Sequence, residues 1–263
     1  MRACSRGPVL ALGLGVALLA AGCASTPEPR VGAERQDPAM INAQLGIAYM
    51  REGKNELALG KFNKALDADP DLIDAHMGVA VLYERLGQEG KAERHYRRAV
   101  ELAPKTPKNA TARNNFGQFL CARGEVGRAL EQFEAAVANP LYERPEIPHT
   151  NAGICARRDG KVEQAERHLR AALRANPRFD RALLEMADLS FEQGRHLPAR
   201  GFFQRYAAVA DHTPESLWLG IRIERALGDD DAVASYSLLL KRKFPDAEET
   251  RLLHDFDKGH ESG

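Results

Sequence analysis

The sequence predicts an all-α protein made of about six stacked helix-turn-helix repeats. One pattern returns at a spacing close to 34 residues: Leu-Gly-x-x-Tyr, then a glycine, then Ala-x-x-x-Phe-x-x-Ala, and finally a proline. Pro70 and Pro104, for example, lie one period of 34 residues apart. Repeats of this length are helical hairpins that cannot bury their apolar faces alone, so neighbouring hairpins stack into a solenoid.

Within a repeat, each recurring residue type has a structural role. In the first copy, Gly46 and Ala58 let the helices approach closely, and Phe62 fills the space between them. Gly53 is expected to end the first helix with a positive φ, and Pro70 to end the second helix. The expected repeats span 39–72, 73–106, 110–142, 146–178, 180–212 and 213–246, in a solenoid at 39–249 followed by a C-terminal tail at 250–263.

This pattern resembles the tetratricopeptide repeat (TPR), whose arrays bind other proteins in a groove lined mainly by the first helix of each unit. The candidate binding residues lie on first helices, offset from the packing positions: Met40, Ile47, Met50, Met77, Val81, Asn114, Gln118 and Ile154. The apolar, methionine-rich start of this set favours an amphipathic helix or an apolar extended segment as the ligand. Alternatively, some of these side chains pack against the tether that precedes the repeats or against a neighbouring helix.

The N-terminus reads as an export signal. Arg2 and Arg6 precede an apolar run of 13 residues, Val9 to Ala21, which is too short for a bilayer span of about 20 residues. The run ends in Leu19-Ala20-Ala21-Gly22-Cys23, which resembles a bacterial lipobox, although leucine stands one position earlier than usual.

The lipobox resemblance implies a signal peptide at 1–22 and covalent lipid on Cys23, with no other cofactor. The alternative is ordinary signal cleavage with Cys23 incidental. No aspartate follows the cysteine, which by resemblance to lipoprotein sorting implies the periplasmic face of the outer membrane of a Gram-negative bacterium. The segment 23–38, rich in Pro, Glu, Arg and Gly, is expected to be a flexible tether.

Cys121 and Cys155 lie on the first helices of adjacent repeats. Stacked helices run about 8–10 Å apart, and a disulfide needs Cα atoms within about 7 Å. In an oxidising periplasm a bridge between them is favoured. The alternative is a pair of buried thiols that act as small apolar residues.

Composition and motifs argue against several functions. The chain has 37 basic and 37 acidic residues, and no basic stripe alternates with aromatic residues, so nucleic-acid binding is not expected. The sequence has no H-E-x-x-H, no G-x-S-x-G and no phosphate-binding loop, and no set of ligands for a metal. We therefore expect neither an enzyme nor a small-molecule substrate. The acidic run Asp229 to Asp231 is expected to cap a helix rather than to bind calcium.

Several segments resemble one family more closely than generic TPR units do. They are Asn114 to Cys121, Asn139 to Tyr142 with Pro145, Asn151 to Cys155, Phe203-x-Arg205-Tyr206, and Ala234 to Asp246. Together with the lipobox, they resemble the type IV pilus biogenesis/stability lipoproteins, the pilotins called PilW or PilF.

The pilotin resemblance implies an outer-membrane lipoprotein of six TPR units that binds the type IV pilus secretin, and helps that ring reach the outer membrane or multimerise. An alternative shares the fold, anchor and compartment but not the partner. It is a periplasmic TPR lipoprotein that recruits peptidoglycan-modifying or envelope-assembly proteins.

Overall fold

The computed structural model describes residues 37–102 and 106–261, with side chains to residue 255. The predicted signal peptide, Cys23 and nearly all of the predicted tether lie outside these residues. The described chain is helical, with thirteen α-helices and no strand. None of these helices is long and apolar enough to cross a membrane.

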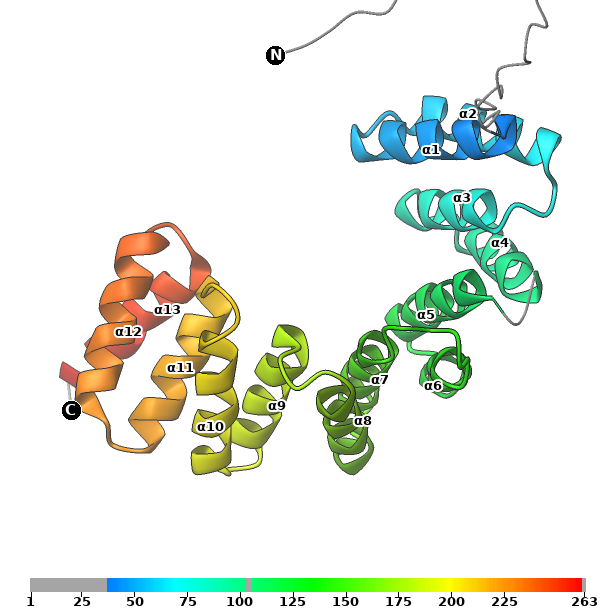
Figure 1. Ribbon diagram of the computed structural model, residues 1–263. Coiled ribbons are helices and arrows are strands. Elements are labelled where there is room, and N and C mark those ends of the chain that lie inside the picture. Colours follow the sequence, from blue (N-terminus) through cyan, green and yellow to red (C-terminus); the bar gives the residue numbers. More distant parts are fainter. Residues whose placement is uncertain (1–36, 103–105, 262–263) are drawn as a thin grey trace, which may run out of the picture. The chain divides into compact units, whose positions relative to one another are not determined.

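Twelve of the helices form six consecutive pairs (Figure 1). The pairs are α1 (Pro38–Arg51) with α2 (Asn55–Ala68), α3 (Ile73–Arg85) with α4 (Glu89–Glu101), α5 (Pro107–Ala122) with α6 (Val126–Val137), α7 (Glu146–Arg158) with α8 (Val162–Ala175), α9 (Asp180–Glu192) with α10 (His196–Ala207), and α11 (Pro214–Ala226) with α12 (Asp230–Lys243).

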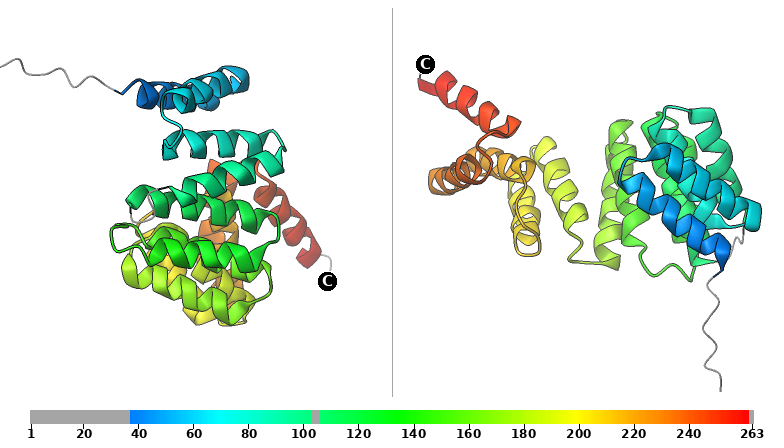
Figure 2. Two further views of the ribbon diagram at one scale, coloured as in Figure 1. Left: turned by 90° about the vertical axis from the view of Figure 1, so that its right-hand side faces the viewer. Right: turned by 90° about the horizontal axis from the view of Figure 1, so that it is seen from above.

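The pairs stack in chain order (Figures 1 and 2). Each first helix packs against its own second helix and against the first helix of the next pair, as α3 does with α4 and α5. Contacts between helices are confined to such near neighbours. The predicted all-α TPR solenoid is therefore confirmed, and its odd-numbered helices form one continuous face.

Glycine ends the first helix of every described pair. Gly53 and Gly87 have φ values of 73° and 67°, as the sequence predicts, and their counterparts in the later pairs are also positive. Glycine tolerates this conformation because it lacks a Cβ, and the reversal starts the second helix two residues later.

The first two pairs are joined around Phe62. This ring is fully buried on α2, between Gly46 on α1 and Gly78 on α3. A Cβ atom at Gly46 would lie 2.7 Å from the ring, and a Cβ at Gly78 would also overlap it. The two glycines therefore make the space that one aromatic side chain fills.

The segment that the sequence analysis treats as a C-terminal tail is helical. Helix α13 (Glu248–Glu261) packs on α11 and α12, as Figure 1 shows. Its Leu253 is fully buried with Leu217 and Leu240, and the Thr250 hydroxyl donates to the Phe244 carbonyl oxygen at 2.7 Å. The helix forms because it covers apolar residues that α11 and α12 would otherwise expose to water.

Candidate protein-binding groove

The face formed by the first helices is hollowed between α3 and α9. This first hollow has a volume of about 440 Å³. Val81, Phe119 and Ile154 give it an apolar wall, and the Tyr96 and Phe133 rings reach it from the second helices. Tyr96 donates its hydroxyl to Glu84 at 2.7 Å, and burial raises the pKa of Tyr96.

Three of the eight predicted groove residues meet in the first hollow. Val81, Gln118 and Ile154 come from α3, α5 and α7, and all three line it. Asn114 lies next to this lining but is only 5% exposed. Its side-chain oxygen accepts a hydrogen bond from the Asn151 amide at 2.8 Å, so it links α5 to α7 instead of facing a ligand.

The methionine-rich start of the predicted groove is mostly packed. Met50 is buried in a cluster with Phe62 and Leu82, so its assignment to the groove is wrong. It continues the buried stripe of α1 that includes Ala43 and Gly46, at the spacing of one helical face. The other three, Met40, Ile47 and Met77, are half-buried against core clusters and do not line the first hollow.

The sequence analysis missed the polar and charged side chains of the first hollow. Asn115, Asn151, Arg158 and Arg181 all line it. The repeat spacing could have identified two of them. The predicted groove residues Gln118 and Ile154 are 36 residues apart, and Asn115 and Asn151, three residues before each, have the same spacing. In the described part of the chain, the guanidinium groups of Arg158 and Arg181 form no hydrogen bond or ion pair.

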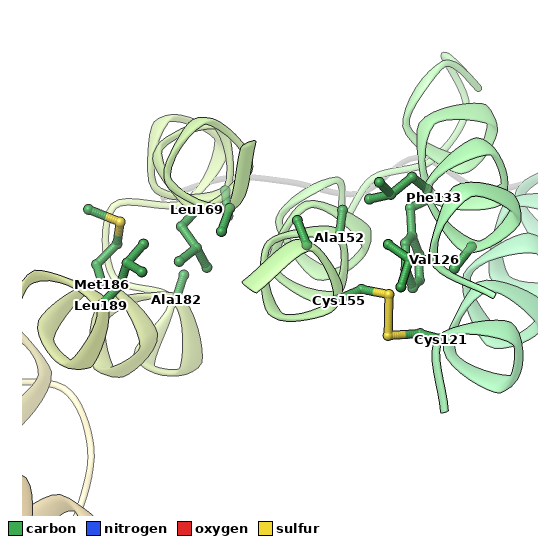
Figure 3. Close-up of a cluster of buried hydrophobic side chains, with 14 of the residues drawn as sticks. Cys121, Val126, Phe133, Ala152, Cys155, Leu169, Ala182, Met186 and Leu189 are labelled. Atoms are coloured by element: carbon green, nitrogen blue, oxygen red, sulfur yellow. A yellow bond between two sulfur atoms is a disulfide. The ribbon is translucent and has the colours of Figure 1, made fainter. Parts of the chain in front are cut away.

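Cys121 and Cys155 are joined by a disulfide at the rim of this region (Figure 3). Their Cα atoms are 5.8 Å apart, and the bond connects α5 to α7. Both sulfur-bearing residues are largely buried. The bridge and the Asn114–Asn151 hydrogen bond therefore hold the same two helices together.

A second hollow of about 360 Å³ lies on the same face, from α7 to α13. Leu184, Trp218 and Leu219 form its apolar part. Its remaining residues are charged: Arg157, Glu185, Asp188, Glu215, Arg222 and Glu249. Four carboxylates therefore face two guanidinium groups, whereas the first hollow has one carboxylate and two guanidinium groups.

Arg157 organises the charges of the second hollow. Its guanidinium pairs with Glu185 at 3.2 Å, with Asp188 at 2.5 Å, and with Glu192. Burial lowers the pKa of Arg157, but the hydrogen bonds that its guanidinium donates to Glu192 and Asp188 outweigh that effect and raise the pKa. Burial also raises the pKa of Glu185, despite the neighbouring Arg157 and Arg181.

Four histidines meet in two pairs at helix contacts. The Nδ1 atoms of His76 and His95 lie 3.0 Å apart between α3 and α4. The ring centroids of His149 and His168 lie 5.9 Å apart between α7 and α8. Within residues 37–102 and 106–255, no three His, Cys, Asp or Glu side chains converge as metal ligands would. Asp229 accepts from the Ala232 amide at 3.1 Å, which confirms that this acidic run caps α12.

Comparison with known proteins agrees with this architecture. The tetratricopeptide repeat family model matches residues 43–107, 91–143 and 150–213. The type IV pilus assembly protein PilF of Pseudomonas aeruginosa is 33% identical over 202 residues, which cover 77% of this chain and 79% of that protein.

Among the solved structures that match most of the chain are two of type IV pilus proteins. The structure of Pseudomonas aeruginosa PilF aligns with a TM-score of 0.71 and 31% identity, and covers 83% of this chain and 97% of its own. The crystal structure of PilW, described as a widely conserved type IV pilus biogenesis factor, aligns with a TM-score of 0.72 and 32% identity, and covers 82% of this chain and 97% of its own.

Proposed function

The chain belongs to the tetratricopeptide repeat proteins and, among them, to the PilF/PilW-like family of type IV pilus biogenesis, and from this premise we propose that it is a pilotin. It binds subunits of the type IV pilus secretin through its first-helix face. It also promotes their delivery to the outer membrane and their multimerisation. In this role it performs no chemistry.

One observation carries the proposal. The similarity to PilF extends over 77% of the chain at 33% identity, so it reaches well beyond the residues that any TPR hairpin needs. The first hollow adds physical support. It presents apolar side chains from three successive first helices beside amide groups with hydrogen-bonding capacity to spare, as a site for an extended polypeptide requires.

The anchor is part of the proposal. Lipid on Cys23 would hold the protein at the periplasmic face of the outer membrane, and the segment 23–38 would give the solenoid reach from that surface. A single acyl chain binds membranes only marginally, so firm retention needs more than one chain on this residue.

The test replaces the chromosomal gene by a null allele and, separately, by the Cys23→Ser allele. We expect the null strain to lose surface pili and secretin multimers while cell shape stays normal. The Cys23→Ser strain should keep the protein in the periplasm and misplace the secretin, which immunoblots of separated membranes will measure.

Normal secretin multimers in the null strain would refute the proposal. Normal pili together with altered cell shape or division would instead support a scaffold for peptidoglycan-modifying or envelope-assembly proteins. Incorporation of labelled fatty acid into wild-type protein, but not into Cys23→Ser, checks the anchor on its own.

A further inference from the structure

The two hollows of the first-helix face adjoin each other and carry opposite charge. Helices α7 and α9 contribute to both: Arg158 and Arg181 face the first hollow, and Arg157 and Glu185 face the second. Guanidinium groups outnumber carboxylates in the first hollow, and carboxylates outnumber guanidinium groups in the second. The charge of the face therefore changes sign along the array.

The repeat register shows how this change arises. In the α7 helix, Asn151 and Ile154 line the first hollow. The residues 34 positions later are Glu185 and Asp188, which line the second hollow. Carboxylates in one repeat thus replace an amide and an alkyl group in the previous one, so a chain lying along the face meets different chemistry in successive repeats.

Both hollows contain charged groups that form no ion pair within the described part of the chain. In the described part of the chain, Arg158 and Arg181 have no carboxylate within ion-pairing distance, and neither Glu215 nor Glu249 pairs with a cation. By contrast, Arg157 and Arg222 both form ion pairs with Asp188, at 2.5 Å and 3.2 Å. The unpaired groups are therefore the ones available to a ligand.

We propose that this face binds one extended segment of a partner protein with a fixed order of charges. The segment places a carboxylate side chain at Arg158 and Arg181, apolar side chains against Ile154 and Val81 and against Leu184 and Trp218, and a Lys or Arg side chain at Glu215 and Glu249. The inference rests on the proposed function, since it specifies which kind of secretin segment the groove accepts.

The length of such a segment follows from helix spacing. Neighbouring helices pack roughly 8–10 Å apart, so α3 to α11 spans roughly 32–40 Å, and a chain that rises about 3.3 Å per residue crosses it in about 10–12 residues. Opposite charges at two separate points of the segment would also fix the direction in which it lies, because the reversed orientation would bring like charges together.

The test uses the full-length protein in detergent and fluorescein-labelled 15-residue peptides that tile the periplasmic sequence of the secretin from the same bacterium. Fluorescence anisotropy measures each dissociation constant. The tightest peptide should contain an acidic residue, an apolar stretch and a basic residue in one order. Exchanging its acidic and basic residues should weaken binding at least about tenfold, which is about 1.4 kcal/mol.

Variants locate the peptide on the protein. Arg158→Gln and Arg181→Gln should each weaken binding several-fold, and peptides whose acidic residue is changed to the amide should no longer distinguish these variants from wild type. Glu215→Gln and Glu249→Gln should also weaken binding several-fold. Peptides that lack the basic residue should bind these two variants and wild type equally. Arg167→Gln on α8 and Glu131→Gln on α6 are matched controls, because both residues are exposed on second helices.

Two results would overturn the inference. One is that the tightest-binding peptide binds all four groove variants with the same affinity as wild type. The other is the absence of any binding peptide while intact secretin still co-purifies with the protein, an outcome that leaves the pilotin proposal standing. If intact secretin also fails to co-purify, both proposals fail.

Discussion

Asn151 donates its side-chain amide to the side-chain oxygen of Asn114 across 2.8 Å, and so joins helices α7 and α5 through two buried residues. The same two helices carry the Cys121–Cys155 bridge. The centre of the array is therefore held by a covalent bond and a buried polar contact, whereas the neighbouring helices α7 and α9 are joined by the ion pairs of Arg157 with Glu185 and Asp188.

Removing one partner of the asparagine pair should destabilise the protein. Asn151→Ala leaves the Asn114 oxygen buried without this donor, and the expected loss is about 1–2 kcal/mol in the free energy of unfolding. The double variant Asn114→Ala with Asn151→Ala should lose less than the sum of the single losses. Urea denaturation of all four proteins measures the coupling, and strictly additive losses would show that the contact contributes nothing.

Breaking the disulfide should cost more. The bridge closes a loop between residues 34 positions apart, and a loop of that length predicts about 3–4 kcal/mol of stabilisation through the unfolded chain. Cys121→Ser with Cys155→Ser should show this loss in urea denaturation, as should wild type in reductant. The double variant itself should be indifferent to reductant, and equal stability of oxidised and reduced wild type would contradict the prediction.

Two glycine substitutions should change the stability of the protein in opposite directions. Gly78→Ala places a methyl group against the buried Phe62 ring and should destabilise the protein by about 1–3 kcal/mol. Gly60→Ala on α2 meets no atom within 4 Å and should stabilise it by about 0.5–1 kcal/mol through helix propensity. Thermal denaturation followed by circular dichroism distinguishes the two signs.

Stability should fall as the pH is lowered from about 6.5 to about 4. Burial, and next the charges of His76 and Arg94, lower the pKa of His95 from 6.5 to about 4. In this pH range His95 binds a proton in the unfolded chain but stays neutral in the folded state, so unfolding is favoured as the pH falls. The whole pKa shift would correspond to about 3 kcal/mol, but the ring is only half-buried, and solvent screening leaves about 1–2 kcal/mol.

The His95→Leu variant isolates this effect. Its midpoint of urea denaturation should change less than that of wild type between pH 7 and pH 4.5, and the remainder reports the other groups, including His149 and His168, whose pKa values burial also lowers. Parallel pH profiles for the two proteins would exclude His95 as a contributor.

Two substitutions to glutamate should separate core from groove. Met50→Glu buries an unpaired carboxylate beside Phe62, so it should unfold the first pairs of helices. Ile154→Glu places the charge in the first hollow, so it should weaken secretin capture while helical content persists. Leu197→Glu, at an exposed residue of α10, should change neither. Full secretin capture by the Ile154→Glu variant would exclude that hollow as the binding site.

The repeat pattern was sufficient to predict the fold because its residues act locally. Gly53 and Gly87 mark turns through their backbone conformation, and Gly46 and Phe62 mark a packing contact within one hairpin. Helix α13 carries none of these marks. Among the side chains that the structure describes in it, Leu253 and Thr250 are buried against the preceding pair, and a few apolar residues in a polar segment give no detectable repeat.

The groove was less predictable for a geometric reason. Successive residues of a helix are 100° apart, so Asn114 and Asn115 face different neighbours, and the angle between stacked helices decides which one meets a ligand. The sequence does not specify that angle. Gln118 and Ile154 were found because they lie in the middle of the exposed stripe, whereas Met50 and Asn114 lie at its edge and turn inward.

Because helices touch only near neighbours, unravelling that starts at one extremity need not travel through the whole molecule. The bridge between Cys121 and Cys155 is a barrier to it, since α5 and α7 cannot separate while that bond is intact. Amide hydrogens of α1 and α2 should therefore exchange with solvent deuterium far sooner than those of α5 and α7. An oxidised molecule that frays in this way keeps a closed middle from which both flanks refold.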